Sequence, residues 1–508
     1  MSVGAPATPW LTTDHYASRA RRAMFVGSIV ALAGAAAYVL AILATGGQPI
    51  LLVPLAGALV AVVVLARPEV GVYLLFGAAL LFEQTEVPGV ASFTDQSHMF
   101  QRIDVYTPIP LPLSIAELLV ILMAVGWGAQ RVAAKRDAFS WGPFGKAVAL
   151  YGAVFVLGTA IGVARGGAWN WNVSVAEVRA PFQMCATYFL AVNLIQGRRQ
   201  LAILMWVFVA LVAVKALQAI WGYAEGQSLS YALEAVTGHE DVVFFDLGLA
   251  LLAIMLVLGL RTKLTFALLL LLPLIIGAEL FTQRRVAFVA LGAVLVVITL
   301  LALARDPRRG VLIATVGLLL TAAYVPLFWD ESGLLALPIR ALRAAVDPTS
   351  VSARDLLSDH WRVVEIRNIE YSVSELPLTG VGVGQELLLR EQPPTLLVAD
   401  WRYITHEALL WLWLKAGLLG AFALWFLVAR VAVWGSALWM RLRDPGLAWV
   451  AAMPVALVCI QVVFSSIDMG LTHSRTMIVL GTVLGAAAAV LARDQVSHAH
   501  SEPKATAT

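Results

Sequence analysis

Long apolar runs recur along almost the whole chain, and they constrain its fold more than any other feature. Many are about 17–25 residues long, the length at which an α-helix crosses a hydrocarbon core about 30 Å thick. Composition agrees, because 60% of the 508 residues are hydrophobic and 13% are charged, against roughly 45–50% and 25% in soluble domains. A membrane barrel would instead show short segments of alternating polarity. The sequence therefore predicts an all-α, polytopic membrane helix bundle.

Hydropathy places about fourteen membrane spans, so we expect about 12–14 transmembrane helices. The spans fall near 23–45, 49–66, 69–82, 113–130, 144–164, 176–196, 201–221, 243–260, 264–282, 286–304, 311–328, 406–430, 448–466 and 474–492. The first run is too long for the apolar part of a signal peptide, so we interpret it as the first membrane helix. Cys185 and Cys459 lie inside apolar runs, which favours packing over a disulfide or a metal site.

Basic residues gather in the short joints between alternate spans. The clusters are Arg19, Arg21 and Arg22; Arg67; Arg131, Lys135 and Arg136; Arg198 and Arg199; Arg261 and Lys263; Arg305, Arg308 and Arg309; Arg441 and Arg443; and Arg493. All of them fall on the cytoplasmic side if both termini are cytoplasmic, as the positive-inside rule requires. The sequence thus predicts a multi-pass membrane protein with both termini in the cytoplasm.

This topology divides the chain into four parts. We expect an N-terminal transmembrane bundle of about eleven helices over 1–328, a large outer loop over 329–405, C-terminal transmembrane helices over 406–492 and a cytoplasmic tail over 493–508. Apolar residues at helical spacing in 337–346 and 353–376 predict one or two short helices in the loop, lying over the outer mouth of the bundle.

A polar stretch inside that loop, HWRVVEIRNIEYSVSELPLTGVGVG (360–384), ends in three alternate glycines. Glycine allows close backbone approach, so the amide groups of Gly380, Gly382 and Gly384 could line an anion site. A tight re-entry turn is the alternative. We expect Arg367 and the carboxylates of this stretch on the solvated side of a loop helix.

Ionisable residues at the outer ends of spans point to chemistry there. Arg284 and Arg285 lie between two apolar spans and break the positive-inside pattern, so they either reach lipid headgroups or hold an anion. His406 opens the span after the large loop and could accept a proton. Weaker candidates are Arg179, Arg367, His473 and Arg475. No Asp-x-Asp pair occurs on an outer loop, so we expect no metal and no cofactor.

The order of these motifs resembles the O-antigen ligase and O-antigen polymerase superfamily of bacterial membrane proteins. That family has an arginine before a Pro-Leu-x-Gly-x-Gly-x-Gly turn, and later a histidine that opens a helix with Gly-Leu-x-Gly. Here Arg362 precedes Pro377–Gly384, and His406 precedes Gly417 and Gly420. The upstream FTQRRVAFVALG resembles the family's Ser-Arg-Gly segment, in which Arg284 or Arg285 would be the counterpart and Arg285 aligns better. This chain departs in having Glu407 where Asn is usual, and no Ser or Gly beside the arginine pair.

The resemblance implies a metal-independent, inverting glycosyltransferase of the bacterial cytoplasmic (inner) membrane. Its active site would face the outside of that membrane. The donor would be a glycan on undecaprenyl diphosphate, and the acceptor either the lipid A core, as in a ligase, or a lipid-linked repeat unit, as in a polymerase. Arg362 and Arg285, with Arg284 in support, would neutralise the departing diphosphate beside the glycine turn, and His406 would accept the acceptor's proton.

Further expected partners are membrane lipids and other polysaccharide-assembly proteins, and no nucleic acid. Two other classes of function stay open. One is a transporter or flippase of lipid-linked sugars, which would move its substrate without making a bond; the other is a non-catalytic membrane scaffold.

Overall fold

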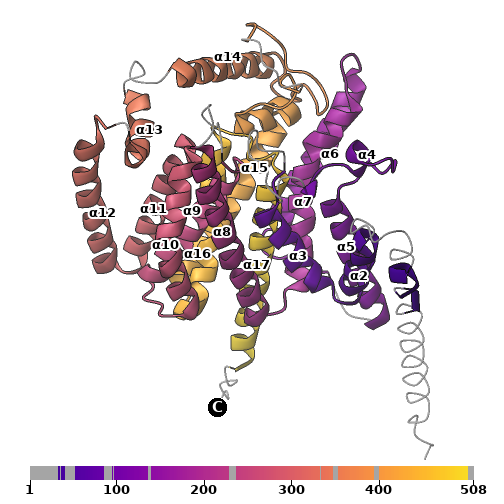
Figure 1. Ribbon diagram of the computed structural model, residues 1–508, viewed down its shortest axis with the longest axis horizontal. Coiled ribbons are helices and arrows are strands. Elements are labelled where there is room, and N and C mark those ends of the chain that lie inside the picture. The colour runs from indigo at the N-terminus through magenta and orange to yellow at the C-terminus, as the bar shows by residue number, and fades with distance from the viewer. Residues whose placement is uncertain are drawn as a thin grey trace, which may run out of the picture. The chain divides into compact units, whose positions relative to one another are not determined.

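The computed structural model describes residues 33–34, 36–40, 52–84, 94, 97–134, 139–227, 236–331, 333–346, 353–393 and 400–501 (Figure 1). The regular secondary structure of these residues is helical. The helices are α2 (Leu52–Ala66), α3 (Pro68–Leu81), α4 (Ile103–Tyr106), α5 (Ile115–Ala134), α6 (Gly145–Arg165), α7 (Trp171–Leu194), α8 (Arg198–Gly226), α9 (Asp241–Val257), α10 (Lys263–Thr282), α11 (Arg285–Arg305), α12 (Pro307–Phe328), the 3₁₀-helix η3 (Leu334–Ala336), α13 (Leu337–Val346), α14 (Ala353–Glu375), α15 (Ala408–Arg441), α16 (Pro445–Ser465) and α17 (Ser474–Ser501). The chain forms two units, Met1–Arg67 with α2 and Pro68–Thr508 with the helices from α3 onward.

The predicted all-α membrane bundle is confirmed. Each predicted span from 49–66 onward coincides with a helix, whereas 23–45 lies mostly outside the described residues. Among the residues that the structure describes, nine helices are long and apolar enough to cross a membrane: α5, α6, α8, α10, α11, α12, α15, α16 and α17. Helices α2 and α3 are shorter apolar helices. Helix α9 has 17 residues, and α7 carries Glu177 and Arg179 within its 24 residues.

Contacts between joints show that several basic clusters of the second unit meet at one end of its bundle. Arg198 Nη1 lies 3.1 Å from Oδ2 of Asp444, so the α7–α8 joint adjoins the α15–α16 joint. Arg305, at the end of α11, donates to the carbonyl of Leu442 at 2.7 Å. Arg493 donates to a carbonyl in the α7–α8 joint. We call this the basic end, and the positive-inside rule predicts that it faces the cytoplasm.

Two helices occur in the large loop, as predicted, and they lie at the other end. Helix α13 coincides with 337–346, and α14 runs crosswise over the upright helices (Figure 1). Trp361, Val364 and Ile369 are buried along α14, as its apolar stripe requires. Helix α11 joins the two ends: Arg285 contacts α14, and the 21 residues of α11 span about 30 Å. We call this the α14 end.

The glycine turn after α14 inserts into a break in α15. In a continuous helix the N–H of Leu418 would bond to the carbonyl of Leu414. Here Leu418 N–H donates to the carbonyl of Pro377 at 3.0 Å, and the Leu414 carbonyl accepts from the N–H of Val381 at 2.7 Å. The break lies at Gly417, which has a φ of +64°. The inserted segment thus satisfies backbone groups that could not be left unpaired inside a membrane protein.

Helix α17 packs along α7 through small residues. Alanines 486 to 489 of α17 are buried. At Gly485 an added Cβ would lie 2.5 Å from the carbonyl oxygen of Tyr188 on α7, and at Gly481 it would meet the carbonyl of Met184. Small residues spaced four apart allow such close backbone approach between membrane helices. This packing fixes α7, whose first turn supports the glycine turn described above.

Candidate functional site

Two arginines from separate helices share one carboxylate at the α14 end. Arg285, the first residue of α11, donates two hydrogen bonds to Asp359 of α14: Nη2 to Oδ1 at 2.9 Å and Nη1 to Oδ2 at 3.3 Å. Arg362, one turn further along α14, places Nη1 at 3.8 Å from the same Oδ1. Two guanidinium groups therefore converge on a single anionic group, although 77 positions (362 − 285) separate them in the chain.

Glu365, one further turn along α14, is buried and pairs with His406, which lies just before α15. Nδ1 of His406 lies 3.4 Å from Oε1 of Glu365, and the His406 backbone N–H donates to both Glu365 oxygens at 3.2 and 3.1 Å. The Trp361 ring packs edge-on against the imidazole, with 5.0 Å between ring centroids. Asp359, Arg362 and Glu365 are spaced three apart, so they share one face of α14.

We name these five residues, Arg285, Asp359, Arg362, Glu365 and His406, the outer cluster. The structure thus brings together all three residues that the sequence singled out for catalysis. Their side chains are 28–31% exposed, so a ligand can reach them, while their surroundings already exclude part of the water. This partial desolvation strengthens electrostatic interactions with an anion.

Two nitrogen donors at the cluster lack a protein partner. Nε of Arg362 and Nε1 of Trp361 are buried and have no hydrogen-bond partner among the described residues. A buried donor left unpaired costs roughly 1–3 kcal/mol. The cluster therefore retains donor capacity that an oxygen-rich ligand could use.

Glu407, which departs from the pattern of the resembled family, has a structural role. Its side chain caps α15 by accepting the N–H of Leu410, a role that Asn also fills well. Burial raises the pKa of Glu407 to about 7, opposed by that hydrogen bond and reinforced by the nearby Glu365. The carboxyl beside His406 therefore changes charge near neutral pH.

One prediction for the loop helix is wrong for a single residue. We expected the carboxylates of 360–384 on the solvated side. Glu370 and Glu375 are exposed as expected, but Glu365 is 3% exposed and pairs with His406. Arg367 does lie on the solvated side, where Nη1 pairs with Glu391 at 3.1 Å and the side chain is 57% exposed. Glu365 lies on the buried face of α14. That face includes polar residues as well as apolar ones, because Asn368 and Ser372 are also buried there.

The three alternate glycines adopt the tight-turn geometry. Gly380, Gly382 and Gly384 all have positive φ, and a Cβ on Gly382 would lie 2.5 Å from the Cα of Gly162 in α6. The N–H of Gly380 donates to the Leu376 carbonyl at 2.9 Å, and that of Gly384 donates to Oε2 of a carboxylate on α7. These two amide groups are therefore committed to protein acceptors, as a re-entry turn requires, rather than directed to an anion.

The carboxylate below the turn belongs to Glu177, which forms a fully buried ion pair. Its Oε1 lies 2.8 Å from Nζ of Lys415 on α15, and both side chains are 0% exposed. Lys415 also donates to the carbonyl of Gln385, just after the turn. The pair therefore ties α7, α15 and the glycine turn together directly beneath the α14 end.

The remaining sequence candidates lie elsewhere. Arg284 precedes the first residue of α11 as its N-cap, next to the cluster residue Arg285. Arg179 pairs with Glu117 at 2.9 Å. His473 and Arg475 belong to a separate buried charge network.

That network centres on the 0% exposed Arg475, which lies 2.9 Å from Glu240 and 2.5 Å from Asp241. Burial alone would raise the pKa of Glu240, but the adjacent Arg475 lowers it to about 2. Nδ1 of His473 lies 3.9 Å from Glu240. The guanidinium of Arg475 is fully enclosed by protein. We interpret it as a structural tie between α17 and α9.

Sequence reasoning missed Asp359, Glu365, Glu177 and Lys415. The spacing of Asp359, Arg362 and Glu365 on one helical face was the available signal for the first two. For Glu177 and Lys415, a charge inside each of two apolar runs was the signal.

Among the described residues, no group of three or more His, Cys, Asp or Glu side chains is arranged to hold a metal ion. The outer cluster instead offers two guanidinium groups and an imidazole, a set suited to an anionic substrate with a proton to be removed. Comparison of the chain with protein-family models and with curated proteins finds no match.

Proposed function

We propose that this multi-pass membrane protein is a glycosyltransferase that transfers or polymerises a glycan from an undecaprenyl-diphosphate donor. The observation that carries the proposal is the meeting of Arg285, Arg362 and His406, from three separate segments, at the end of the bundle opposite the basic end. With the basic end in the cytoplasm, the cluster faces the outside, where lipid-linked glycans are presented for assembly.

The arginines supply the stabilisation of the leaving group. Arg285 and Arg362 already converge on the Asp359 carboxylate, which occupies an anion position between them. A diphosphate carries more charge than a carboxylate, and guanidinium groups bind phosphate oxygens through paired hydrogen bonds. Nε of Arg362, which has no hydrogen-bond partner among the residues that the structure describes, adds a donor. Cations that are already positioned where negative charge develops commonly make a large contribution to catalysis.

His406 supplies the base. If Nδ1–H donates to Glu365, Nε2 carries the lone pair and can accept a proton, and the carboxylate stabilises the imidazolium that forms. The acceptor hydroxyl oxygen then forms a bond to the sugar C1 while its proton moves to Nε2. The bond between C1 and the phosphate oxygen breaks, and its electron pair leaves with the lipid diphosphate. Attack opposite the leaving group inverts the anomeric configuration.

The direct test uses the purified full chain in lipid nanodiscs with an undecaprenyl-diphosphate-linked oligosaccharide and a glycan or glycolipid acceptor. We expect Arg362→Ala, Arg285→Ala and His406→Ala to lower transfer by about 10²–10⁴-fold. Arg367→Ala is the matched control, because Arg367 lies on the same helix but outside the cluster. Full transfer by the His406 and Arg362 variants would overturn the proposal. In a deletion strain, unattached long polymer on the carrier lipid identifies a ligase and single repeat units identify a polymerase.

A transporter or flippase of lipid-linked sugars is the second candidate, and one observation favours it. Asp246 of α9 and Glu279 of α10 are buried, and none of their carboxyl oxygens has a hydrogen-bond partner among the described residues. Ionisable groups at such depth often mark ion pathways in transporters. Movement of a labelled lipid-linked glycan across proteoliposomes without formation of a glycosidic bond, and loss of that movement in Asp246→Asn, would establish this alternative.

A further inference from the structure

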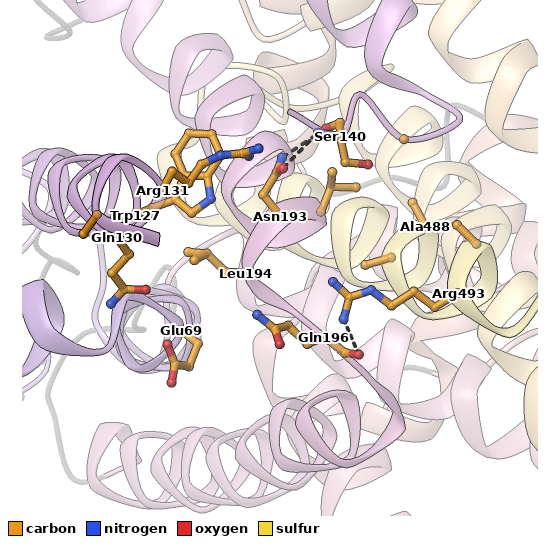
Figure 2. Close-up of a pocket in the computed structure, with 15 residues that line it drawn as sticks. Glu69, Trp127, Gln130, Arg131, Ser140, Asn193, Leu194, Gln196, Ala488 and Arg493 are labelled. Carbon is orange, nitrogen blue, oxygen red and sulfur yellow. Dashed lines mark hydrogen bonds between the residues drawn. The ribbon is translucent and has the colours of Figure 1, made fainter. Parts of the chain in front are cut away.

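A cavity of about 550 Å³ opens at the basic end, far from the outer cluster. It lies between α3, α5, α7 and α17, and its lining includes Glu69, Trp127, Arg131, Asn193 and Arg493 (Figure 2). The length of helix α7 gives the distance between the cavity and the glycine turn at the α14 end. Its N-cap Asn170 donates to the Gly384 carbonyl at the glycine turn, whereas Asn193 near its other end lines the cavity. The 24 residues of α7 cover about 36 Å, more than the roughly 30 Å thickness of a membrane core.

Two arginines face each other across this cavity. Figure 2 shows the guanidinium groups of Arg131 and Arg493 on opposite sides, both turned toward the middle. Arg131 lies over the Trp127 ring at 4.9 Å from its centroid, which orients the guanidinium without neutralising it. Arg493 donates to the backbone carbonyl of Gln196, which also leaves its charge in place.

The charge of the cavity is positive on balance. Among the described residues, no carboxylate forms an ion pair with Arg131 or Arg493, and Glu69 is the one carboxylate among the lining residues. Two guanidinium charges against one carboxylate leave a net charge of +1. Cations that line a concave, partly enclosed surface attract anions more strongly than the same cations on an open surface.

The lining also has an apolar side. Leu194, Val192 and three alanines of α17 line the cavity beside the polar groups. A ligand that is anionic at one end and apolar at the other fits this combination better than a small anion does.

We propose that this cavity binds the phosphate of an anionic phospholipid headgroup in the leaflet at the basic end. Arg131 and Arg493 hold the phosphate oxygens from two sides, and the acyl chains lie against the apolar lining residues of α7 and α17. Guanidinium groups suit this task because they bind phosphate oxygens in pairs. The site is separate from the outer cluster, and the proposal does not depend on the glycosyltransferase function. A free phosphate ion shares the same headgroup chemistry, so the experiment distinguishes the two sources.

The test measures binding to the purified full chain in a non-ionic detergent by microscale thermophoresis. The probes are dioctanoyl phosphatidylglycerol, dioctanoylglycerol with the same chains but no phosphate, and inorganic phosphate. We expect phosphatidylglycerol to bind more tightly than both others, and its affinity to fall as salt is raised. Arg131→Gln and Arg493→Gln should each raise its Kd about tenfold.

Two further variants keep the test specific. Ala492→Phe fills the cavity without removing a charge, and it should also weaken phosphatidylglycerol binding, because Ala492 lines the cavity. Arg441→Gln removes an exposed arginine outside the cavity and should leave the Kd unchanged. Thermal unfolding of each variant verifies that it is folded.

Each result of the binding measurements either supports or overturns the proposal. Inorganic phosphate that binds as tightly as the lipid, with the same sensitivity to both arginine variants, supports the phosphate site and assigns free phosphate as its source. Equal binding of dioctanoylglycerol, or an unchanged Kd in both arginine variants, overturns the proposal.

Discussion

The imidazole of His406 and the carboxylate of Glu365 form a pair 3.4 Å apart, although 41 positions separate them in the chain. Glu365 is almost fully buried and also accepts the backbone N–H of His406. Two contacts from one carboxylate therefore determine both where the histidine lies and how its ring is turned. Such a partner is what a proton-accepting histidine needs, because it fixes the tautomer and stabilises the charged ring.

The first prediction concerns this pair. Glu365→Gln keeps the size of the side chain but removes its charge, so the imidazolium loses its stabilising partner. We expect kcat for glycan transfer to fall by about tenfold or more with little change in KM.

Glu370→Gln is the matched control, since Glu370 is exposed on the same helix. A merely structural role of Glu365 predicts a lower melting temperature with an unchanged kcat of the folded protein, and that result would contradict the positioning role.

The second prediction concerns Asp359, which holds Arg285 and Arg362 in the absence of a ligand. A diphosphate must compete with this carboxylate for the two guanidinium groups. Asp359→Asn should therefore lower the KM for the lipid-diphosphate donor, by up to about fivefold, which is the range of a partly exposed ion pair. Steady-state kinetics in nanodiscs measures this change.

Glu391→Gln gives the comparison, because Glu391 also pairs with an arginine of α14 but outside the cluster. A raised KM in Asp359→Asn would show that Asp359 orients the arginines instead of competing for them.

Much of the fold follows from one-dimensional patterns in the sequence. A membrane helix is recognised by its own length and apolarity, so the spans from 49–66 onward coincide with helices. The amphipathic spacing of 337–346 and 353–376 likewise depends only on local sequence, and α13 and α14 lie there.

The candidate site was harder to predict, because partners depend on three-dimensional packing. Arg285, Arg362 and His406 could be singled out by charge and by motif order. That Glu365 pairs with His406, 41 positions further along the chain, depends on how α14 packs against α15, which the local sequence of α14 does not specify. The glycines show the same limit. The backbone of Gly162 on α6 leaves no room for a side chain at Gly382, and this contact cannot be recognised from the motif.

The third prediction tests the buried ion pair beneath the glycine turn. Lys415→Met leaves the carboxylate of Glu177 buried without its cation, and breaking one partner of such a pair typically costs about 3–5 kcal/mol of unfolding free energy. The double variant Glu177→Leu/Lys415→Met should recover part of this loss, because no charge then remains buried. Denaturant unfolding in detergent provides the measurement.

Lys146→Met serves as control, since Lys146 is exposed at the start of α6, and its effect should stay within about 0.5 kcal/mol. A double variant as unstable as Lys415→Met would show that the pair contributes through packing rather than charge.

The fourth prediction tests the glycine turn. Gly382 has a φ of +100°, and a Cβ there would lie 2.5 Å from backbone atoms of Gly162. Gly382→Ala should therefore lower the free energy of unfolding by more than the roughly 1–3 kcal/mol of backbone strain alone. Gly333→Ala is the control, because Gly333 has a φ of −72° and open space around it. Equal melting temperatures for the two variants would contradict the close packing of the turn on α6.

The fifth prediction concerns pH. The pKa of Glu407 is raised from 4.5 to about 7, mainly by burial. Between these two pH values the folded state keeps a proton that the unfolded state has released. This group's contribution to stability is therefore complete below pH 4.5, falls as pH rises to about 7 and is lost above it.

Glu407→Gln, whose side chain can still cap α15, should remove this contribution, so its melting temperature declines less between pH 5 and 8 than that of the parent chain. Melting curves of both proteins across that range, with the exposed Glu370→Gln as control, measure the difference. Parallel pH dependences would show that Glu407 does not titrate in this window.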